Sequence, residues 1–253
     1  MAVLDVIVPR LVSLPGVVAV VLGGSRARGT NRPDSNWDIG LYYRGGFDAG
    51  LIAGLGFPGR VAQPGEWGRI VNGGAWLSVD GAPVDVLLRD LDVIEGWLVD
   101  AQAGHFEIDN VEGHIAGLPT YTPVGELAIS RVLHGRLPRV TYPDALRTAA
   151  GMRWRWGGGF SLVHAEKYAR RGDVTLAAGT MARATAQTAH GVLAERGEWV
   201  LNEKGIVDAA GLAAAHEIIG TCARDPEGAV RRMRELLSPP RLDELNARTA
   251  GAP

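Results

Sequence analysis

The spacing of apolar positions changes near residue 120 of this chain. Before that point, short apolar runs predict strands at 17–22, 37–43, 75–79 and 83–88, the last two joined by an Asp-Gly turn. Helical spacing predicts helices at 3–13, 47–55 and 90–103, and the glycine-rich, polar stretch 60–74 is expected to be a loop. Together these elements predict a small mixed β-sheet with helices.

Beyond residue 120 the pattern is almost wholly helical. Periodicity fades over 104–122, and Pro119 and Pro123 mark a connection, so we expect a first domain at 1–120 and a second at 121–253. Helices are predicted at 124–133, 143–171, 174–196, 209–222 and 226–237. The glycines at 157–159 are expected to break or kink the long helix, and the tail after Pro240 to fray. The predicted fold class is α+β, a mixed-sheet domain followed by an all-α helical bundle.

Composition narrows the possible functions. A chain of 253 residues, 46% of them hydrophobic, can bury a sizeable core, and its net charge of −2 disfavours an extended nucleic-acid surface. The single cysteine, Cys222, cannot form an intrachain disulfide, and the six histidines lack zinc-ligand spacing. No secretory signal and no apolar run approaching the ~18 residues of a membrane span is found, which favours a cytoplasmic protein.

The stretch from residue 22 to residue 43 has the features of a phosphate site. A buried strand ends in Gly23-Gly24-Ser25, and a glycine pair lets backbone N–H groups approach a phosphate without hindrance from a Cβ atom. Ser25 adds a hydroxyl donor and Arg28 a cation. The common phosphate loop is excluded because no Gly-Lys-Ser/Thr follows, and the dinucleotide fingerprint because the third glycine is missing. The stretch therefore predicts a triphosphate cradle.

Three polar positions are candidate metal ligands. Asn36 and Asp38 are two residues apart on a predicted strand, so their side chains project from the same face. Asp85 is embedded in the apolar run 84–88 and is the best candidate for a carboxylate from a neighbouring strand. Hard oxygen ligands of this kind suit Mg²⁺ bound together with nucleotide phosphates.

This ordered set resembles the signature of the polymerase-β-type nucleotidyltransferase superfamily. The form Gly-Ser-Arg-Ala-Arg-Gly with a helical partner domain is similar to its small-molecule branch, which modifies aminoglycosides and lincosamides. The resemblance implies that Asp38 and Asp85 bind Mg²⁺ with position 36, where Asn36 departs from the family's aspartate. It also implies ATP or another nucleoside triphosphate as co-substrate, bound by Gly24, Ser25 and Arg28, with a phosphate role for Lys204 in the helical domain.

Three functions follow from the resemblance. The first is transfer of a nucleoside monophosphate, AMP from ATP, to a hydroxyl of a small molecule such as an aminoglycoside, as in antibiotic resistance. The second is a toxin–antitoxin type adenylyltransferase acting on protein or tRNA, which the ~130 residues of helical domain disfavour. The third is a catalytically impaired nucleotide-binding protein, since an amide at position 36 carries no charge and accepts no proton.

Several further side chains are candidates for the rest of a site. Trp154 and Trp156 are interpreted either as a stacking wall for a base or, for at least one of them, as core. Acidic residues near the domain junction would suit a cationic acceptor: Glu107, Asp109, Glu112 and Glu126.

Overall fold

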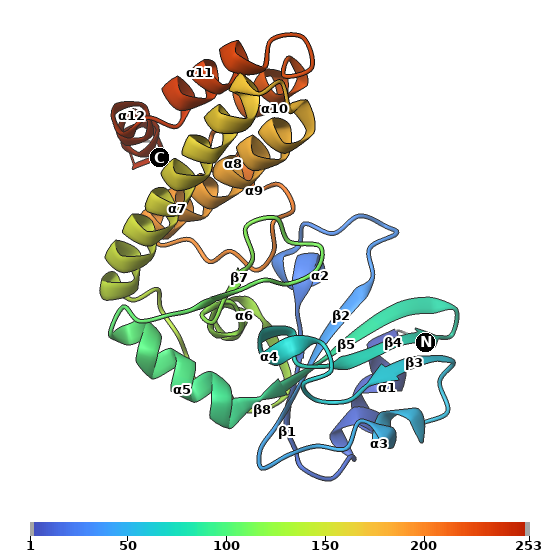
Figure 1. Cartoon of the computed structure of the whole chain (residues 1–253). Helices are drawn as coiled ribbons and strands as arrows, with labels where there is room; N and C mark the ends of the chain where they lie inside the picture. Colours follow the sequence, from blue (N-terminus) through green and yellow to red (C-terminus); the bar gives the residue numbers. More distant parts are fainter. Residues whose placement is uncertain (1–2, 251–253) are drawn as a thin grey trace. The chain divides into compact units, whose positions relative to one another are not determined.

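The computed structural model describes residues 3–250, which form two compact units (Figure 1). Of the described residues, the first unit comprises 3–99 and 119–141, and the second 100–118 and 142–250. The chain therefore passes between the units near residues 99, 119 and 141, whereas the sequence pattern suggests one passage near residue 120. The predicted fold class is confirmed: a mixed sheet with helices precedes a helical region.

The first unit is built on a six-stranded sheet in the order β3-β4-β5-β2-β1-β8. Its central strands, β1 (Val17–Leu22), β2 (Trp37–Tyr43), β4 (Gly74–Val79) and β5 (Ala82–Asp90), match the predicted ones closely. Strands β2 and β5 run parallel, and every other neighbouring pair is antiparallel. Asp80 and Gly81 have positive φ angles of 50° and 80°, as the predicted tight hairpin between β4 and β5 requires.

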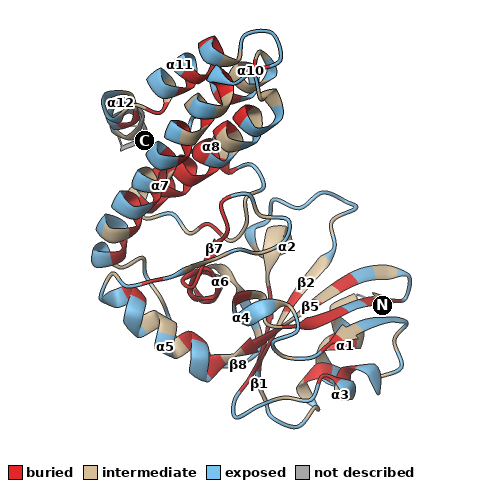
Figure 2. Cartoon of the chain, in the orientation of Figure 1, coloured by how far each residue is buried: buried red, intermediate tan, exposed pale blue. Residues whose placement is uncertain are grey.

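The two faces of this sheet have different neighbours. One face packs against α1 (Val3–Val12) and α3 (Gly50–Ala53) through a core that includes Ile7, Leu11, Ile39 and Val86. Because side chains alternate along a strand, Asp38 and Asp85 project from the opposite face. Buried residues are concentrated on the central strands (Figure 2).

The structure corrects the predicted loop at 60–74. This stretch forms an edge strand, β3 (Gly59–Ala62), and a short helix, α4 (Gly68–Val71). This four-residue strand pairs with β4 on one side only, two of its residues are exposed, and its sequence lacks a clear alternation of apolar and polar positions. The segment therefore read as a loop from its sequence.

The predicted helix at 124–133 is also partly wrong. Helix α6 (Thr122–Ile129) ends where Ser130 takes an extended conformation, and β8 (Arg131–Gly135) follows as an edge strand paired with β1. Without β8, β1 would be the edge strand of the sheet, and its backbone groups on that side would have no strand partner. Pairing with β8 satisfies them. Residues 131–135 thus complete the sheet of the first unit.

A buried ion pair attaches α6 to the sheet. Arg89 of β5 is 4% exposed and donates to both carboxylate oxygens of Glu126, over 2.6 and 2.8 Å, and to the Val71 carbonyl. Burial opposes the charge, but Glu126 offsets it, so the pKa of Arg89 lies above its ordinary value. Glu126 is therefore engaged in the fold, which corrects its interpretation as a ligand for a cationic acceptor.

We expect Arg89→Met to destabilise the protein by about 3–5 kcal/mol, because it leaves the Glu126 carboxylate buried without its partner. The double variant Arg89→Met/Glu126→Leu should regain most of this loss. Arg44 pairs with Asp92 and Glu95 at the surface, so Arg44→Met should cost much less than Arg89→Met. Urea unfolding measures all three variants, and equal losses for Arg89→Met and Arg44→Met would contradict the argument.

The second unit is built around an antiparallel helix pair, α7 (Asp144–Arg170) and α8 (Val174–Arg196). The carboxylate of Asp173 accepts a hydrogen bond from the Leu176 backbone N–H, which confirms its predicted role as the cap of α8. Trp154 is buried and stacks on His190, with ring centroids 4.5 Å apart, whereas Trp156 is exposed. One of the two tryptophans is therefore core, as expected.

The glycines at 157–159 do not interrupt α7, contrary to the prediction. A Cβ atom at Gly158 would overlap with the Thr188 hydroxyl, and one at Gly151 would lie 2.6 Å from Cγ of Glu195. Both neighbours are on α8. These glycines therefore allow α7 and α8 to approach each other closely.

Burial also determines the charge state of His190. Desolvation, followed by the proximity of His114, lowers the pKa of His190 to about 4, so the ring is neutral at pH 7. Its interaction with Glu203, at 3.9 Å, is therefore not an ion pair at that pH.

No helix within residues 3–250 combines the length and apolar character needed to cross a membrane.

Smaller elements complete the chain: α5 (Leu91–Gln102), β6 (Ile108–Asp109), β7 (Leu118–Pro119), α9 (Ile206–Ala209), α10 (Ala214–Gly220), α11 (Pro226–Leu236) and α12 (Pro239–Ala250). Helix α5 confirms the prediction at 90–103, and Asp90 caps it by accepting from the Asp92 and Val93 N–H groups. The helix expected at 209–222 is instead two short helices, because Gly211 between them has a φ of +79°.

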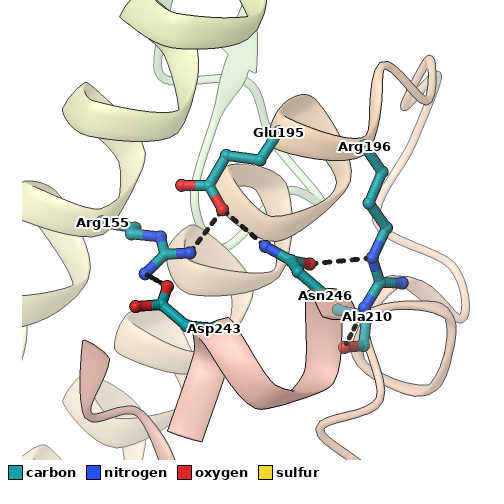
Figure 3. Close-up of polar contacts among 6 residues, drawn as sticks. All are labelled: Arg155, Glu195, Arg196, Ala210, Asp243 and Asn246. Carbon is teal, nitrogen blue, oxygen red and sulfur yellow. Dashed lines mark hydrogen bonds and ion pairs between the residues drawn. The ribbon is translucent and has the colours of Figure 1, made fainter. Parts of the chain in front are cut away.

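Helix α12 corrects the expectation that the tail frays. Figure 3 shows the polar contacts around this helix, which are made among six residues: Arg155, Glu195, Arg196, Ala210, Asp243 and Asn246. Asp243 pairs with Arg155 of α7, and Asn246 donates to Glu195 over 2.8 Å and accepts from Arg196 over 3.0 Å. These bonds, together with the buried Leu242, hold a segment whose two leading prolines suit the start of a helix.

Candidate active site

The predicted phosphate cradle is a strand-to-helix turn at the end of β1. Gly23 donates its N–H to the Asp38 carbonyl over 2.8 Å, and α2 (Gly24–Arg28) begins at the next residue. Gly24 has a φ of +60°, and a Cβ atom there would overlap with Oδ2 of Asp38. The glycine is thus needed for a second reason besides phosphate approach, because it makes room for the Asp38 carboxylate beside the turn.

The three candidate metal ligands come together on one face of the sheet. Asp38 of β2 and Asp85 of β5 are direct partners in the parallel pair, so their side chains project side by side from strands about 4.8 Å apart. Asn36, just before β2, donates from Nδ2 to Oδ2 of Asp85 over 3.0 Å. Asp38 therefore lies between the Gly24 turn and Asp85.

Arg26 organises the loop that carries Asn36, a role that the sequence did not indicate. Its guanidinium donates to the carbonyls of Ser35 and Asn36 over 2.6–3.2 Å and lies 4.1 Å from the Trp37 ring centroid. These contacts hold the end of the loop that leads into β2. The one hint in the sequence is that Arg26 and Arg28 are two residues apart, because residues at that spacing on a helix do not lie on the same face.

Residues 4–100 match the family model described as "Nucleotidyltransferase domain". The matched range includes Gly24, Ser25, Arg28, Asn36, Asp38 and Asp85. Nucleotidyl transfer in general terms is the activity that this domain supports.

One solved structure is similar over most of the chain. It is the crystal structure of a nucleotidyltransferase-like protein from Exiguobacterium sibiricum 255-15, with 11% sequence identity and a TM-score of 0.41. The alignment covers 98% of this chain and 74% of that chain. A search of curated proteins found no match.

The other predicted site residues lie on different parts of the chain. Ser25 is the second residue of α2 and is half-buried, and Arg28 is exposed at the end of that helix. Lys204 is exposed in the second unit, where it borders a cavity of about 600 Å³ with Glu203, His114 and His216. The phosphate roles of these residues stay predictions.

The donor set of the domain fits a Mg²⁺ ion that is also bound by nucleotide. Among residues 3–250, no cluster of three or more His, Cys, Asp or Glu side chains could hold a metal without help. Two neighbouring carboxylates, Asp38 and Asp85, suffice for Mg²⁺ when phosphates and water supply the remaining oxygens. The amide of Asn36 currently directs its NH₂ group, which cannot ligate a cation, toward Asp85.

We expect Gly24→Ala to lower nucleotidyl transfer by roughly 10- to 100-fold, because displacing a carboxylate by about 1 Å costs that much. Gly29→Ala is the matched control. Gly29 also has a positive φ, +71°, but a Cβ atom there meets nothing within 4 Å, so this variant carries the backbone strain without displacing Asp38. Steady-state rates and melting temperatures separate the two effects, and equal rates for both variants would rule out the steric explanation.

Proposed function

We propose that this protein transfers AMP from ATP to a hydroxyl of a small molecule, such as an aminoglycoside or a related antibiotic. The observation that carries the proposal is the pairing of Asp38 with Asp85 beside the Gly24 turn. The apolar core that includes Ile39 and Val86 lies on the opposite face of the sheet, so the two carboxylates are not part of it. The domain match over residues 4–100 supports the nucleotidyl-transfer part of the proposal.

The residues divide the chemistry between them. The acceptor hydroxyl attacks the α-phosphorus of ATP, the bond to the bridging oxygen breaks, pyrophosphate leaves, and the hydroxyl proton is released to water. Backbone N–H groups at Gly24 and Ser25, with Arg28, bind the phosphates and stabilise negative charge that develops on them. Asp38, Asp85 and the Asn36 amide would hold Mg²⁺, which when bound polarises the phosphoryl group. Through that ion, Asp38 and Asp85 would also orient the nucleotide for attack.

A nucleotide-binding protein without efficient catalysis is the second candidate. The hydrogen bond from Asn36 to Asp85 favours it, because an amide donor satisfies one oxygen of that carboxylate in the absence of any metal. Such a site would bind a Mg²⁺-nucleotide complex through Asp38 and Asp85 and transfer it slowly.

One experiment tests the proposal and separates the two candidates. The protein is incubated with each nucleoside triphosphate, with MgCl₂ or EDTA, and with a panel of hydroxylated antibiotics. Mass spectrometry then follows the acceptors, and equilibrium dialysis follows the nucleotide. Metal-dependent addition of a nucleoside monophosphate to an acceptor supports the enzyme, and binding without addition supports the second candidate. If neither addition nor binding is detected, both candidates are refuted.

A further inference from the structure

Trp76 occupies the position beside Asp85 on the next strand of the sheet. In the β4–β5 pair Trp76 lies directly opposite Asp85, so the two side chains project from the same face with Cβ atoms about 5 Å apart. The indole of Trp76 is 52% exposed although it lies in the middle of a strand. A large apolar side chain left open next to a catalytic carboxylate is suited to contact a substrate.

Trp76 is held by a second tryptophan. The ring centroids of Trp67 and Trp76 are 4.5 Å apart, with an interplanar angle of 31°. Trp67 lies over Gly74, since a Cβ atom at position 74 would come within 2.9 Å of the Trp67 ring. Gly74 thus lets the Trp67 ring rest against the sheet, and the ring supports one side of Trp76. We call Trp67 and Trp76 the tryptophan pair.

The order of the strands shows where the tryptophan pair lies relative to the Gly24 turn and the two carboxylates. From β1 to β4, the same face presents the Gly24 turn, Asp38, Asp85 and then Trp76. If the turn binds the phosphates, the tryptophan pair lies across the carboxylates from them. The acceptor hydroxyl must approach from that opposite side for an in-line displacement.

We propose that the tryptophan pair is the acceptor platform, and that the acceptor is a ring-shaped, hydroxylated small molecule. This proposal rests on the proposed transfer activity. The apolar face of a sugar or cyclitol ring covers an indole well, and a ring amine gains a cation–π contact with Trp, the aromatic side chain that gives the strongest one. A ring lying on Trp76 places a peripheral hydroxyl within one strand spacing of Asp85. Linear polyols lack the rigid face that such a platform selects.

The test measures the kinetics of Trp76→Ala, Trp76→Phe and Trp67→Ala with streptomycin, lincomycin and the linear polyol sorbitol as acceptors. Met152→Ala is the control, because Met152 is a 65% exposed apolar side chain of the second unit. Trp76→Ala should raise the acceptor KM about tenfold or more, leave the KM for ATP unchanged, and be largely rescued by Trp76→Phe. Trp67→Ala should have a smaller effect in the same direction, and sorbitol should react poorly with every variant.

Two results would overturn the platform. A rise in the KM for ATP instead of the acceptor would assign the tryptophan pair to the nucleobase, and an effect no larger than that of Met152→Ala would remove the pair from the site. Calorimetric titration of streptomycin and lincomycin without nucleotide keeps the platform testable if no transfer is found. Weaker binding to Trp76→Ala than to wild type would support the platform while the transfer activity fails, and no binding to wild type would end the proposal.

Discussion

Asp38→Asn is expected to lower the transfer rate by about 10³-fold or more, and Asp85→Asn should have an effect of similar size. Each substitution keeps the shape of the side chain and removes one of the two carboxylates that project side by side from β2 and β5. A metal that polarises a phosphoryl group contributes several kcal/mol, and each 1.36 kcal/mol changes the rate tenfold. Loss of one of two anionic ligands should therefore remove most of the activity.

The control for charge is Asp34→Asn, because Asp34 is an exposed aspartate in the loop before β2. A surface charge at this position is screened by solvent, so this variant should keep the transfer rate within about twofold of wild type. Steady-state rates over a range of MgCl₂ concentrations distinguish weakened metal binding, which excess Mg²⁺ rescues, from lost catalysis. Full activity of Asp38→Asn and Asp85→Asn at low Mg²⁺ would show that the metal site lies elsewhere.

The central sheet was accessible from sequence because its strands are apolar runs bounded by turn signals. Residues 17–22 and 37–43 match β1 and β2, and the Asp-Gly hairpin sets the register of β4 against β5. That register, with the alternation along β5, places Asp85 on the face opposite the core. The grouping of Asn36, Asp38 and Asp85 followed from period-two geometry, and the structure brings these three residues together.

The edges of the fold were not accessible in this way. Strands β3 and β8 pair on one side only, so burial does not impose a regular pattern on their residues. Helix α12 depends on bonds to Arg155, Glu195 and Arg196, which lie about 50 or more residues earlier in the chain. Long-range contacts of this kind leave no local signature in a single sequence.

The same limit applies to the candidate site. Trp67 lies in the stretch interpreted as a loop, and its packing over Gly74 depends on the position of β4. Trp76 reads as an ordinary strand residue until its pairing with Asp85 is known. Arg26 looks equivalent to Arg28 in the sequence, yet only its contacts with Ser35 and Asn36 show that it holds the loop in place.

Asn36→Asp is expected to raise the transfer rate by on the order of 10²-fold, the range for restoring a missing metal ligand or base. The structure adds a second consequence. Asn36 donates to Asp85 over 3.0 Å, so an aspartate there removes that donor and places a like charge beside Asp85. Without metal the variant should therefore melt at a lower temperature than wild type. Mg²⁺ should restore its stability, because an ion that binds only the folded state stabilises it.

The measurement pairs transfer rates with melting curves recorded in EDTA and in MgCl₂, and Asn31→Asp is the control. Asn31 is an exposed asparagine of the same loop whose side chain donates to the Arg32 carbonyl, so the same change of charge there should alter neither the rate nor the response to Mg²⁺. A larger Mg²⁺-dependent rise in melting temperature for Asn36→Asp than for wild type would place position 36 at the metal. If the rate and the response to Mg²⁺ both stay at the wild-type level, position 36 is not a ligand, and the hydrogen bond to Asp85 serves only to hold the loop.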